Sequence, residues 1–555
     1  MHIKSITTLF VALIVGLSLA ACDVDDPDEP EEDLTFEMGT EEDRAALFDY
    51  LVEKTMERDA FASLPEHPVH REHPMGIDVV ELMEQYRDDL VEAETEKEMW
   101  LALHKISNAR KDRHLSVSTV EGGLEVPDEL IQDVAAPIRF KVDYADLDDR
   151  FFFVSDLGEE IEQHMEGDVV PELGDRLVSV NEMSGSDYIE AIRPYWRYST
   201  ENRLWRRVSE IIGEKRSHVP HSEFYREDLE LVLERPDGTR YEVVLPYLDP
   251  DEIDWQMYKD RDHLDWNRYH EREYPGFTRE PVMDEYETLN LFVSDDDELP
   301  VVILQWYGFR GDLLDAMDRL MEYADEQNLL DYNVIVDATR SRGGSNGAYA
   351  LARMQGEKFR ATKHNLKVSD ISQRWVENRL ESWEENPPEN ERGQNPVYEK
   401  EWMETDAMNA FEEDRYYTND VPFKGGQPKW ADGTVKPAEK HFRGDMVVWL
   451  SPRGGSHLDQ FAAQVVDNDL AHVMGMATGG FSNSWSASET LRFPTTDKPI
   501  VEYEWSMGHS IRPNGEILQY NPAEPHEYIP QTRDNMFEYR SMLLERSLEH
   551  MGLED

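Results

Sequence analysis

Ser456 stands where an apolar run ends and a helical pattern begins. The run MVVWL (446–450) is followed by SPRGG, and after Ser456 apolar residues recur at i, i+3, i+4 and i+7 from Leu458. This spacing forms one face of a helix. Ser456 is therefore predicted at a helix N-terminus, where free N–H groups and positive potential gather. A serine in that position can cap the helix, or it can act as a nucleophile whose oxyanion the N–H groups stabilise.

His114 is the candidate base for such a nucleophile. A serine hydroxyl is a weak nucleophile until a neighbouring base takes its proton, and histidine commonly serves as that base. His114 lies in the stretch KDRHL, at the end of a helical pattern. The alternative interpretation is a hydrogen-bonding histidine at a helix-to-strand junction.

An acyl-transfer site also needs two donors aimed at one oxyanion. The backbone N–H of His457, directly after the candidate nucleophile, is the natural first donor. The second is expected from the loop at Gly343 and Gly344, because glycine permits close approach of the backbone. The alternative for these glycines is an ordinary strand-to-helix turn.

The same loop contains a rival nucleophile. GGSNG (343–347) fits the pattern G-x-S-x-G, in which Ser345 would be the nucleophile of an α/β-hydrolase-type esterase. In that pattern the serine follows its strand almost at once, whereas TRSR separates the strand from the motif here. The pattern also leaves Ser456 and KDRH without a role.

The charge of the chain restricts its partners. The 555 residues carry 118 acidic and 56 basic side chains, for a formal net charge of -62. Phosphate would be repelled, so a nucleic-acid partner is not expected. Only 17 of the 56 basic residues are lysine. An acidic surface poor in lysine favours a protein that works in high salt, where screening removes self-repulsion; the alternative is an ordinary soluble acidic surface.

No metal or cofactor is predicted. The stretch HPVHREHP contains His67, His70 and His73, but its prolines break helical spacing. A solvent-exposed loop is therefore favoured over a metal cluster.

The N-terminus predicts export and lipidation. Residues 1–21 read as a signal peptide, with an apolar run too short for a membrane span. LAAC resembles a bacterial lipobox, in which Cys22, the one cysteine of the chain, would be lipidated. Residues 22–40 are acidic and contain proline, as expected of a disordered tether. The mature protein is predicted in the cell envelope, held by a lipid outside the cytoplasmic membrane, either periplasmic or at the surface.

The rest of the chain divides by pattern. Residues 41–120 are mainly helical and carry His114. Residues 125–250 read mainly as strands, with PDG as a hairpin turn. Residues 255–550 alternate strands and helices, as in a largely parallel α/β sheet. Within them, residues 361–440 are irregular and rich in tryptophan, and read as an insertion with no assigned role.

Four stretches, taken in order, resemble the tail-specific (C-terminal-processing) serine protease family. They are ALHKISNARKDRHLSV, ELGDRLVSVNEM, NVIVDATRSRGGSNG and the segment around Ser456, within residues 100–529. The resemblance implies a catalytic core with the crotonase-like or ClpP-like β-α superhelix. It also implies that 125–250 is a PDZ-like module, which can bind an extended polypeptide substrate along a strand edge.

The family has two catalytic branches. One pairs the serine with a lysine about 25 residues downstream, but Phe481 occupies that position and no lysine occurs before Lys498. The other branch, which resembles the tricorn core protease, uses an upstream histidine, matched by His114, and a late glutamate. Gln519 stands at the spacing of that glutamate, with Glu516 and Glu524 as alternatives by a shift of register. Gln519 can orient an imidazole, but it cannot stabilise an imidazolium as a carboxylate does.

The sequence therefore predicts a lipid-anchored serine endopeptidase. Ser456 attacks the scissile carbonyl to form an acyl-enzyme, and His114 takes the proton. The alternative is a catalytically inactive binding module on the same fold, which the missing glutamate favours.

Overall fold

The computed structural model describes residues 36–62, 73–131, 133–215, 224–255, 274–309, 311–389, 392, 396–422, 433–483 and 485–553. The predicted signal peptide, Cys22 and most of the tether lie outside the described residues, as do His67 and His70. Within the described part of the chain, every helix is too short or too polar to span a bilayer.

A mixed seven-stranded sheet forms the centre of the C-terminal half. Its order is β10-β11-β12-β13-β18-β19-β23, parallel from β12 to β23 and antiparallel at β10 and β11. The bounds are β10 Phe277–Glu280, β11 Leu289–Ser294, β12 Val301–Trp306, β13 Asn333–Asp337, β18 Met446–Leu450, β19 His472–Gly475 and β23 Glu527–Tyr528. The apolar runs VVILQW and MVVWL are buried throughout, as parallel strands covered on both faces should be. The predicted α/β core is confirmed.

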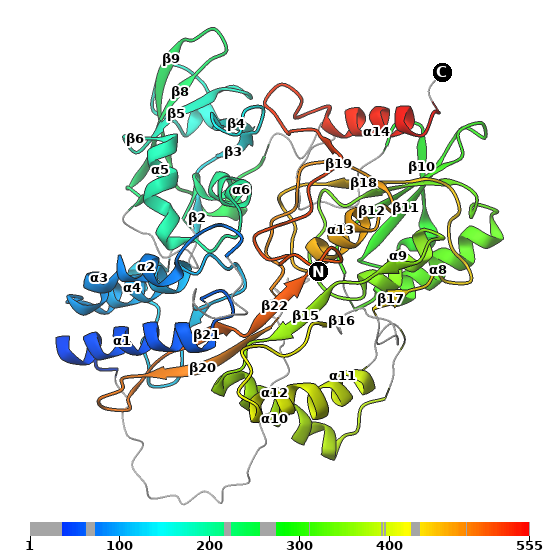
Figure 1. Cartoon of the computed structure of the whole chain (residues 1–555). Coiled ribbons are helices and arrows are strands. Elements are labelled where there is room, and N and C mark those ends of the chain that lie inside the picture. Colours follow the sequence, from blue (N-terminus) through cyan, green and yellow to red (C-terminus); the bar gives the residue numbers. More distant parts are fainter. Residues whose placement is uncertain are drawn as a thin grey trace, which may run out of the picture.

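Helices cover both faces of this sheet (Figure 1). On one face lie α8 Leu313–Glu326, α9 Gly347–Met354 and α13 His457–Asp467, and on the other α14 Tyr539–His550. Side chains of β18 alternate between the two cores, with Val448 and Leu450 in one and Val447 and Trp449 in the other. This alternation follows from the strand geometry, in which successive side chains point to opposite faces.

A second, antiparallel sheet lies in the region 125–250. Its order is β3-β4-β5-β8-β9, with β6 paired to β5. The bounds are β3 Ile138–Asp143, β4 Phe151–Leu157, β5 Arg176–Val180, β6 Met183–Ser184, β8 Asp228–Glu234, β9 Arg240–Pro246, with helices α5 Gly185–Ile192 and α6 Glu201–Ile211. Leu229, Leu231 and Leu233 point inward at every second position of β8 and pack in one core with Leu204 of α6.

The helices expected near the N-terminus are present as α1 Glu41–Arg58, α2 Val79–Glu84, α3 Arg87–Val91 and α4 Glu96–Asn108. Thr40 and Thr95 begin α1 and α4 with capping boxes, in which Asp43 and Glu98 bond back to the threonine N–H groups. The end of α4 fixes where the chain turns toward His114.

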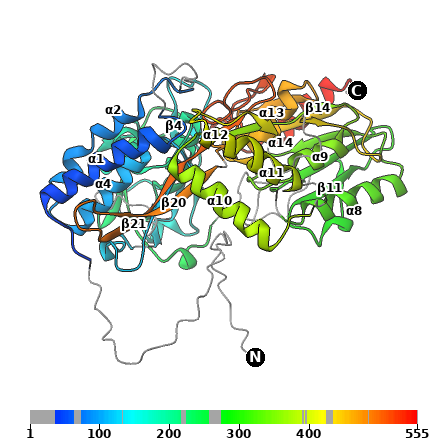
Figure 2. The same ribbon diagram turned by 60° about the horizontal axis from the view of Figure 1, so that its bottom comes forward.

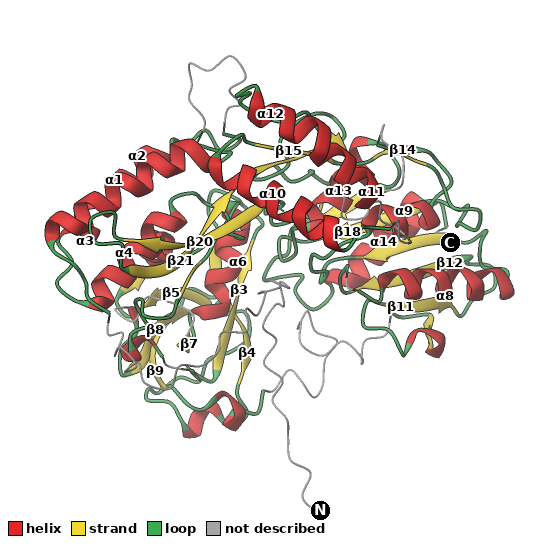
Figure 3. Cartoon of the chain, turned by 90° about the horizontal axis from the view of Figure 1, so that it is seen from below, coloured by secondary structure: helices red, strands yellow, loops and turns green. Residues whose placement is uncertain are grey.

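The segment 361–440 packs against these N-terminal helices. It contains α10 Asp370–Glu385, α11 Pro396–Trp402, a π-helical turn Met403–Ala407 and α12 Met408–Glu412. Trp383 and Trp402 share one hydrophobic core with Leu47 of α1 and with Trp505. Figures 2 and 3 show α10 lying between the N-terminal helices and the seven-stranded sheet. The segment thus joins two parts of the chain that lie far apart in sequence.

Shorter strands complete the architecture. They are β1 Val117–Ser118, β2 Val134–Ala135, β7 Glu214–Lys215, β14 Phe359–Arg360, β15 Lys363–Leu366, β16 Val421–Pro422, β17 Thr434–Val435, β20 Ser486–Arg492, β21 Pro499–Ser506 and β22 Gly508–Ile511. β20 and β21 form a hairpin paired to β1, and β22 pairs with β15.

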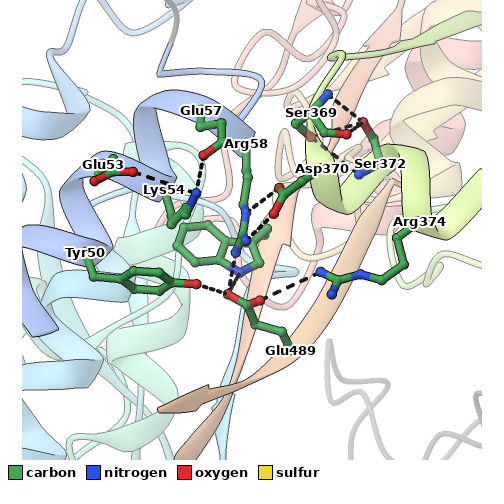
Figure 4. Close-up of polar contacts among 11 residues, drawn as sticks. Tyr50, Glu53, Lys54, Glu57, Arg58, Ser369, Asp370, Ser372, Arg374 and Glu489 are labelled. Atoms are coloured by element: carbon green, nitrogen blue, oxygen red, sulfur yellow. Dashed lines mark hydrogen bonds and ion pairs between the residues drawn. The ribbon is translucent and has the colours of Figure 1, made fainter. Parts of the chain in front are cut away.

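A buried arginine ties α1 to this hairpin and to α10 (Figure 4). Arg58, at the end of α1, is 3% exposed. Its guanidinium donates to both carboxylate oxygens of Asp370, at 2.8 and 2.6 Å, and also binds Glu489 of β20. Such a bidentate pair fixes orientation as well as distance.

Candidate active site

Ser456 lies at the turn between β18 and α13 in a backbone conformation that few serines adopt. Its φ and ψ are 61° and -122°, and its side chain makes no capping hydrogen bond. Its N–H donates to the carbonyl oxygen of Phe481 at 2.8 Å. A positive φ at a residue other than glycine costs about 1–3 kcal/mol and persists where the surroundings enforce it, often at functional sites. Of the two interpretations of Ser456, the capping serine is therefore wrong.

The glycines before Ser456 make this turn possible. A Cβ at Gly454 would lie 2.3 Å from the carbonyl oxygen of Ser341, and one at Gly455 would lie 2.3 Å from the ring of Phe481. Both distances are far below van der Waals contact, so any side chain would push the turn away from the neighbouring loops. The sequence SPRGGS therefore folds as a tight bend that presents the serine hydroxyl.

His114 meets Ser456 across 342 positions of sequence. Its Nε2 lies 3.3 Å from Ser456 Oγ. The edge of the His114 ring packs against Phe481, with centroids 5.6 Å apart, and its side chain is 29% exposed. A separation of 3.3 Å is loose for a hydrogen bond, but catalytic hydrogen bonds commonly tighten only when substrate binds.

Asp112, two residues before His114, provides the carboxylate that faces the imidazole. Its Oδ1 accepts the backbone N–H of His114 at 2.9 Å and lies 3.7 Å from His114 Nδ1. Its Oδ2 accepts a hydrogen bond from the Asn483 side chain at 2.9 Å. Burial acts to raise the pKa of Asp112, but the hydrogen bonds and the charge of His114 hold it below its ordinary value. A buried, ionised carboxylate therefore stands beside the imidazole.

The second imidazole nitrogen of His114 points into this environment. Nδ1 is buried, and within the described residues it has no hydrogen-bond partner. The carboxylate of Asp112 is beyond hydrogen-bond distance, yet close enough for a charge interaction. A small shift of the ring toward Asp112 would give Nδ1–H an acceptor.

Gln519 does not contact His114 directly, which corrects the expectation that it orients the imidazole. The fully buried Gln519 side chain accepts the backbone N–H groups of Ser482 and Asn483, at 2.5 and 2.9 Å, and donates to Ser199 Oγ at 3.2 Å. It therefore holds the loop from which Asn483 reaches Asp112. Its link to the histidine is indirect.

The alternative late acids are also placed elsewhere. Glu516 is 62% exposed and accepts hydrogen bonds from Asn514 and Asn521. Glu524 is exposed, although partial burial raises the pKa of its carboxyl. Neither has a hydrogen bond to His114.

The predicted oxyanion donors lie around Ser456. His457 is the first residue of α13, so its N–H is one of those that the helix cannot satisfy internally. Gly343 lies directly against the serine, because a Cβ there would be 2.5 Å from Ser456 Cβ and 2.9 Å from Oγ. Gly344 has a φ of 148° and approaches Phe309 so closely that a Cβ would meet its carbonyl oxygen at 1.7 Å. The loop depends on both glycines, and which N–H completes the hole stays a prediction.

The His457 side chain ties the two loops together. It is 1% exposed, and its Nε2 accepts the backbone N–H of Gly347 at 2.7 Å. Burial lowers the pKa of His457 to about 3, so the ring is neutral near pH 7 and can accept this bond. His457, whose backbone N–H is the predicted first oxyanion donor, therefore also positions the loop 343–347 through its side chain.

Ser345 has neither the strained backbone of Ser456 nor its contact with His114. Its N–H donates to the Phe309 carbonyl, and its hydroxyl accepts a hydrogen bond from the Asn346 side chain at 3.4 Å. The strained strand-to-helix turn that the G-x-S-x-G pattern requires is found at Ser456 instead.

The described residues contain no group of three or more histidine, cysteine or acidic side chains arranged to hold a metal ion. His73 is 9% exposed and stacks on Tyr520 with centroids 4.4 Å apart. The expectation of a solvent-exposed loop is therefore wrong at this histidine.

The contribution of Asp112 was missed from the sequence, although D-x-H in KDRHL was the available signal.

The architecture matches solved structures of CPAF. The structure of mature CPAF complexed with lactacystin is similar with a TM-score of 0.66 and 15% identity, over 91% of this chain and 97% of that chain. A second structure of mature CPAF gives 0.64 and 16%, over 91% and 96%. The photosystem II D1 C-terminal processing protease gives 0.36 and 10%, over 88% and 92%. Neither a protein-family model nor a curated protein sequence matches this chain.

The likeness to CPAF extends over nearly the whole of both chains, so it establishes the fold. The resemblance indicated by the four motifs is confirmed at that level: this chain has the fold of the tail-specific serine proteases.

Proposed function

We propose that this chain is a serine endopeptidase of the tail-specific type, with Ser456 as nucleophile and His114 as general base. The observation that carries the proposal is the 3.3 Å approach of His114 Nε2 to Ser456 Oγ. The strained backbone of Ser456 supports the proposal, because in that conformation the hydroxyl makes no capping hydrogen bond to α13.

The reaction would proceed in two steps. His114 takes the hydroxyl proton of Ser456 as the serine oxygen attacks the scissile carbonyl carbon, and the oxyanion is held by the N–H of His457 and one from the Gly343–Gly344 loop. His114 then gives the proton to the leaving amine, which leaves an acyl-enzyme. Water, activated by the same imidazole, hydrolyses the ester. Asp112 stabilises the imidazolium that forms in each step.

The antiparallel sheet of residues 125–250 is proposed as a PDZ-like module that takes an extended polypeptide. The sheet ends at β3 and β9. Glu166 already pairs with Val244 of β9, so β3 is the proposed edge, where strand addition supplies backbone hydrogen bonds to a peptide without fixing its sequence. Lipidation of Cys22 and a place in the cell envelope, outside the cytoplasmic membrane, are proposed from LAAC alone.

The test uses Ser456→Ala, His114→Ala and the double variant, assayed on an unfolded protein. Because the two residues act as one unit, each single variant should lose as much activity as the double, about 10⁴–10⁶-fold in kcat. A fluorophosphonate probe should label wild type and not Ser456→Ala. Lactacystin, which is bound in a CPAF structure, is tested as a second ligand of wild type and Ser456→Ala.

Ser345→Ala is the matched control and should be far milder. Full activity in Ser456→Ala with loss in Ser345→Ala would transfer the nucleophile to the G-x-S-x-G motif. If wild type shows neither cleavage nor labelling, the alternative of a catalytically inactive binding module on this fold stands.

A further inference from the structure

Four arginines, hereafter the arginine cluster, gather beside the candidate catalytic pair. They are Arg113, Arg197, Arg203 and Arg207. They come from the loop that carries His114, from the stretch before α6, and from α6 itself. In a chain with twice as many acidic as basic residues, a local concentration of positive charge needs a physical reason.

Hydrogen bonds attach the cluster to the backbone around both catalytic residues. Arg113 directly precedes His114, and Arg197 donates to the carbonyl oxygen of Leu115 at 2.9 Å. Arg203 donates to the carbonyl oxygens of Pro452 and Arg453, in the turn that leads to Ser456.

Phe481 forms a common wall between the cluster and the catalytic pair. The guanidinium of Arg203 lies 5.2 Å from the centre of the Phe481 ring. The edge of His114 packs against the same ring, and the Phe481 carbonyl holds the N–H of Ser456. Through Arg203 the cluster therefore borders the catalytic pair and is not a distant surface patch.

The cluster has few carboxylate partners. Arg207 forms an ion pair with Glu210, which is also paired with Arg206. The hydrogen bonds of Arg197 and Arg203 go to carbonyl oxygens. Arg113 is partly buried, and among the described residues it makes neither a hydrogen bond nor an ion pair.

Burial and the neighbouring like charges shift the pKa values of these groups. Burial first, and then the like charges of Arg197 and Arg207, lower the pKa of Arg113 to about 9. Asp112 and Glu210 act in the opposite direction but do not balance them. Burial likewise lowers the pKa of Arg197 and Arg203. A partly buried cation without a counter-ion is costly, and a bound anion would remove that cost.

We propose that the arginine cluster is a substrate subsite for a carboxylate, the side chain of an aspartate or glutamate close to the scissile bond. This inference rests on the proposed peptidase function and adds a substrate class to it. Guanidinium groups match a carboxylate with paired hydrogen bonds in a fixed geometry. Arg113 and Arg197 are the principal donors because, among the described residues, neither forms an ion pair with a carboxylate, although the charges of Asp112 and Glu504 act on Arg197 from a greater distance.

The test compares quenched fluorescent peptides that differ at one residue beside the scissile bond, as glutamate, glutamine or lysine. Each is made with a free and with an amidated C-terminus, and all are assayed at one ionic strength. Wild type should cleave the glutamate peptide with about 10- to 100-fold higher kcat/KM than the glutamine peptide, the range expected of charged hydrogen bonds. The lysine peptide should be poorest.

Arg113→Gln and Arg197→Gln should bring the glutamate-to-glutamine ratio toward 1. Arg546→Gln is the matched control, because this arginine lies on α14, is 46% exposed and pairs with Glu527 and Glu549; it should keep the wild-type ratio. The ratio within one variant cancels any general loss of activity from mutation next to His114.

Equal cleavage of glutamate and glutamine peptides by wild type would overturn the subsite and leave the peptidase standing. A preference that follows only the free C-terminus would overturn the side-chain assignment in favour of a terminal carboxylate. If no peptide is cleaved, binding of the same peptides to Ser456→Ala by fluorescence anisotropy decides: tighter binding of the glutamate peptide supports the subsite, and equal binding contradicts it.

Discussion

At the scale of the residue, a line of hydrogen bonds runs from Gln519 to the backbone of His114, the proposed general base. Gln519 holds the backbone of Asn483, Asn483 donates to Asp112, and Asp112 accepts the N–H of His114. In the proposed mechanism, the charge that the family pattern places late in the sequence comes instead from Asp112, two residues before His114. Gln519 serves as a positioning residue at the far end of this line.

Asp112→Asn tests this arrangement. The amide keeps the shape of the side chain but removes the charge that stabilises the imidazolium, so kcat should fall about 10²–10⁴-fold. Steady-state kinetics on a peptide substrate measure it, and circular dichroism checks that the fold survives.

Gln519→Glu is the informative companion to Asp112→Asn. A glutamate could still accept the two backbone N–H groups, and Ser199 could donate to it, so activity should change by no more than a few fold. Unchanged activity in Asp112→Asn, together with a large gain in Gln519→Glu, would contradict the assignment and return the acid to the late position.

His457 should make stability depend on pH. Its pKa is about 3 in the folded protein, against about 6.5 in an unfolded chain. Between these values the unfolded chain binds a proton that the folded protein does not. The contribution of His457 to stability is therefore complete above pH 6.5 and is lost as pH falls toward 3, by about 1.4 kcal/mol per pH unit.

The comparison with His457→Gln isolates this effect, because glutamine can accept the Gly347 N–H without titrating. The difference in unfolding free energy between the two proteins, measured by urea denaturation from pH 7 to pH 4, should move in favour of the variant as pH falls. Asp459, whose pKa burial raises to about 6, acts in the opposite direction but is common to both proteins. A difference independent of pH would contradict the prediction.

At the scale of the element, local pattern predicted much of the structure. The strands VVILQW, NVIVD and MVVWL were predictable because continuous apolar runs of that length suit a covered parallel sheet. The helices between residues 41 and 109 were predictable from their apolar periodicity. The packing of 361–440 against α1 was not, because the pairing of Arg58 with Asp370 joins residues 312 positions apart.

The candidate site divides in the same way. Ser456, His114 and the glycines could be proposed from motifs, since each motif is a local pattern of turn, helix and strand. The contacts of Gln519 could not, because they depend on how the loop at Ser482 folds back on the sheet. The spacing of Gln519 in the sequence therefore identified a residue that supports the surroundings of His114, but it predicted a direct contact with His114, whereas Gln519 contacts Ser482, Asn483 and Ser199.

The tie between α1, α10 and β20 should carry a large share of the local stability. Arg58→Met removes the buried cation that Asp370 and Glu489 share (Figure 4). The loss should be about 2–4 kcal/mol, at the lower end for buried pairs because Asp370 is 46% exposed. Urea denaturation and amide exchange across α1 and α10 measure it.

Arg374→Ala is the control for the Arg58 variant. Arg374 approaches the same Glu489 at 3.9 Å but is 56% exposed, so its removal should cost less than about 1 kcal/mol. Equal effects of the two substitutions would show that the network contributes as a surface feature and not through the buried arginine.

At the scale of the whole molecule, the net charge of -62 should set the response to salt. Excess carboxylates repel one another over the screening length, which is about 8 Å at physiological ionic strength and about 3 Å at 1 M. Raising sodium chloride from 0.1 to 2 M should therefore raise the melting temperature by several degrees.

Because screening depends on ionic strength and not on the identity of the ion, potassium chloride should act equally at equal concentration. Sucrose at matched water activity should give a smaller rise. A melting temperature that stays flat with both salts would show that self-repulsion is already offset by local ion pairs, and the adaptation to high salt predicted from the composition would then be wrong.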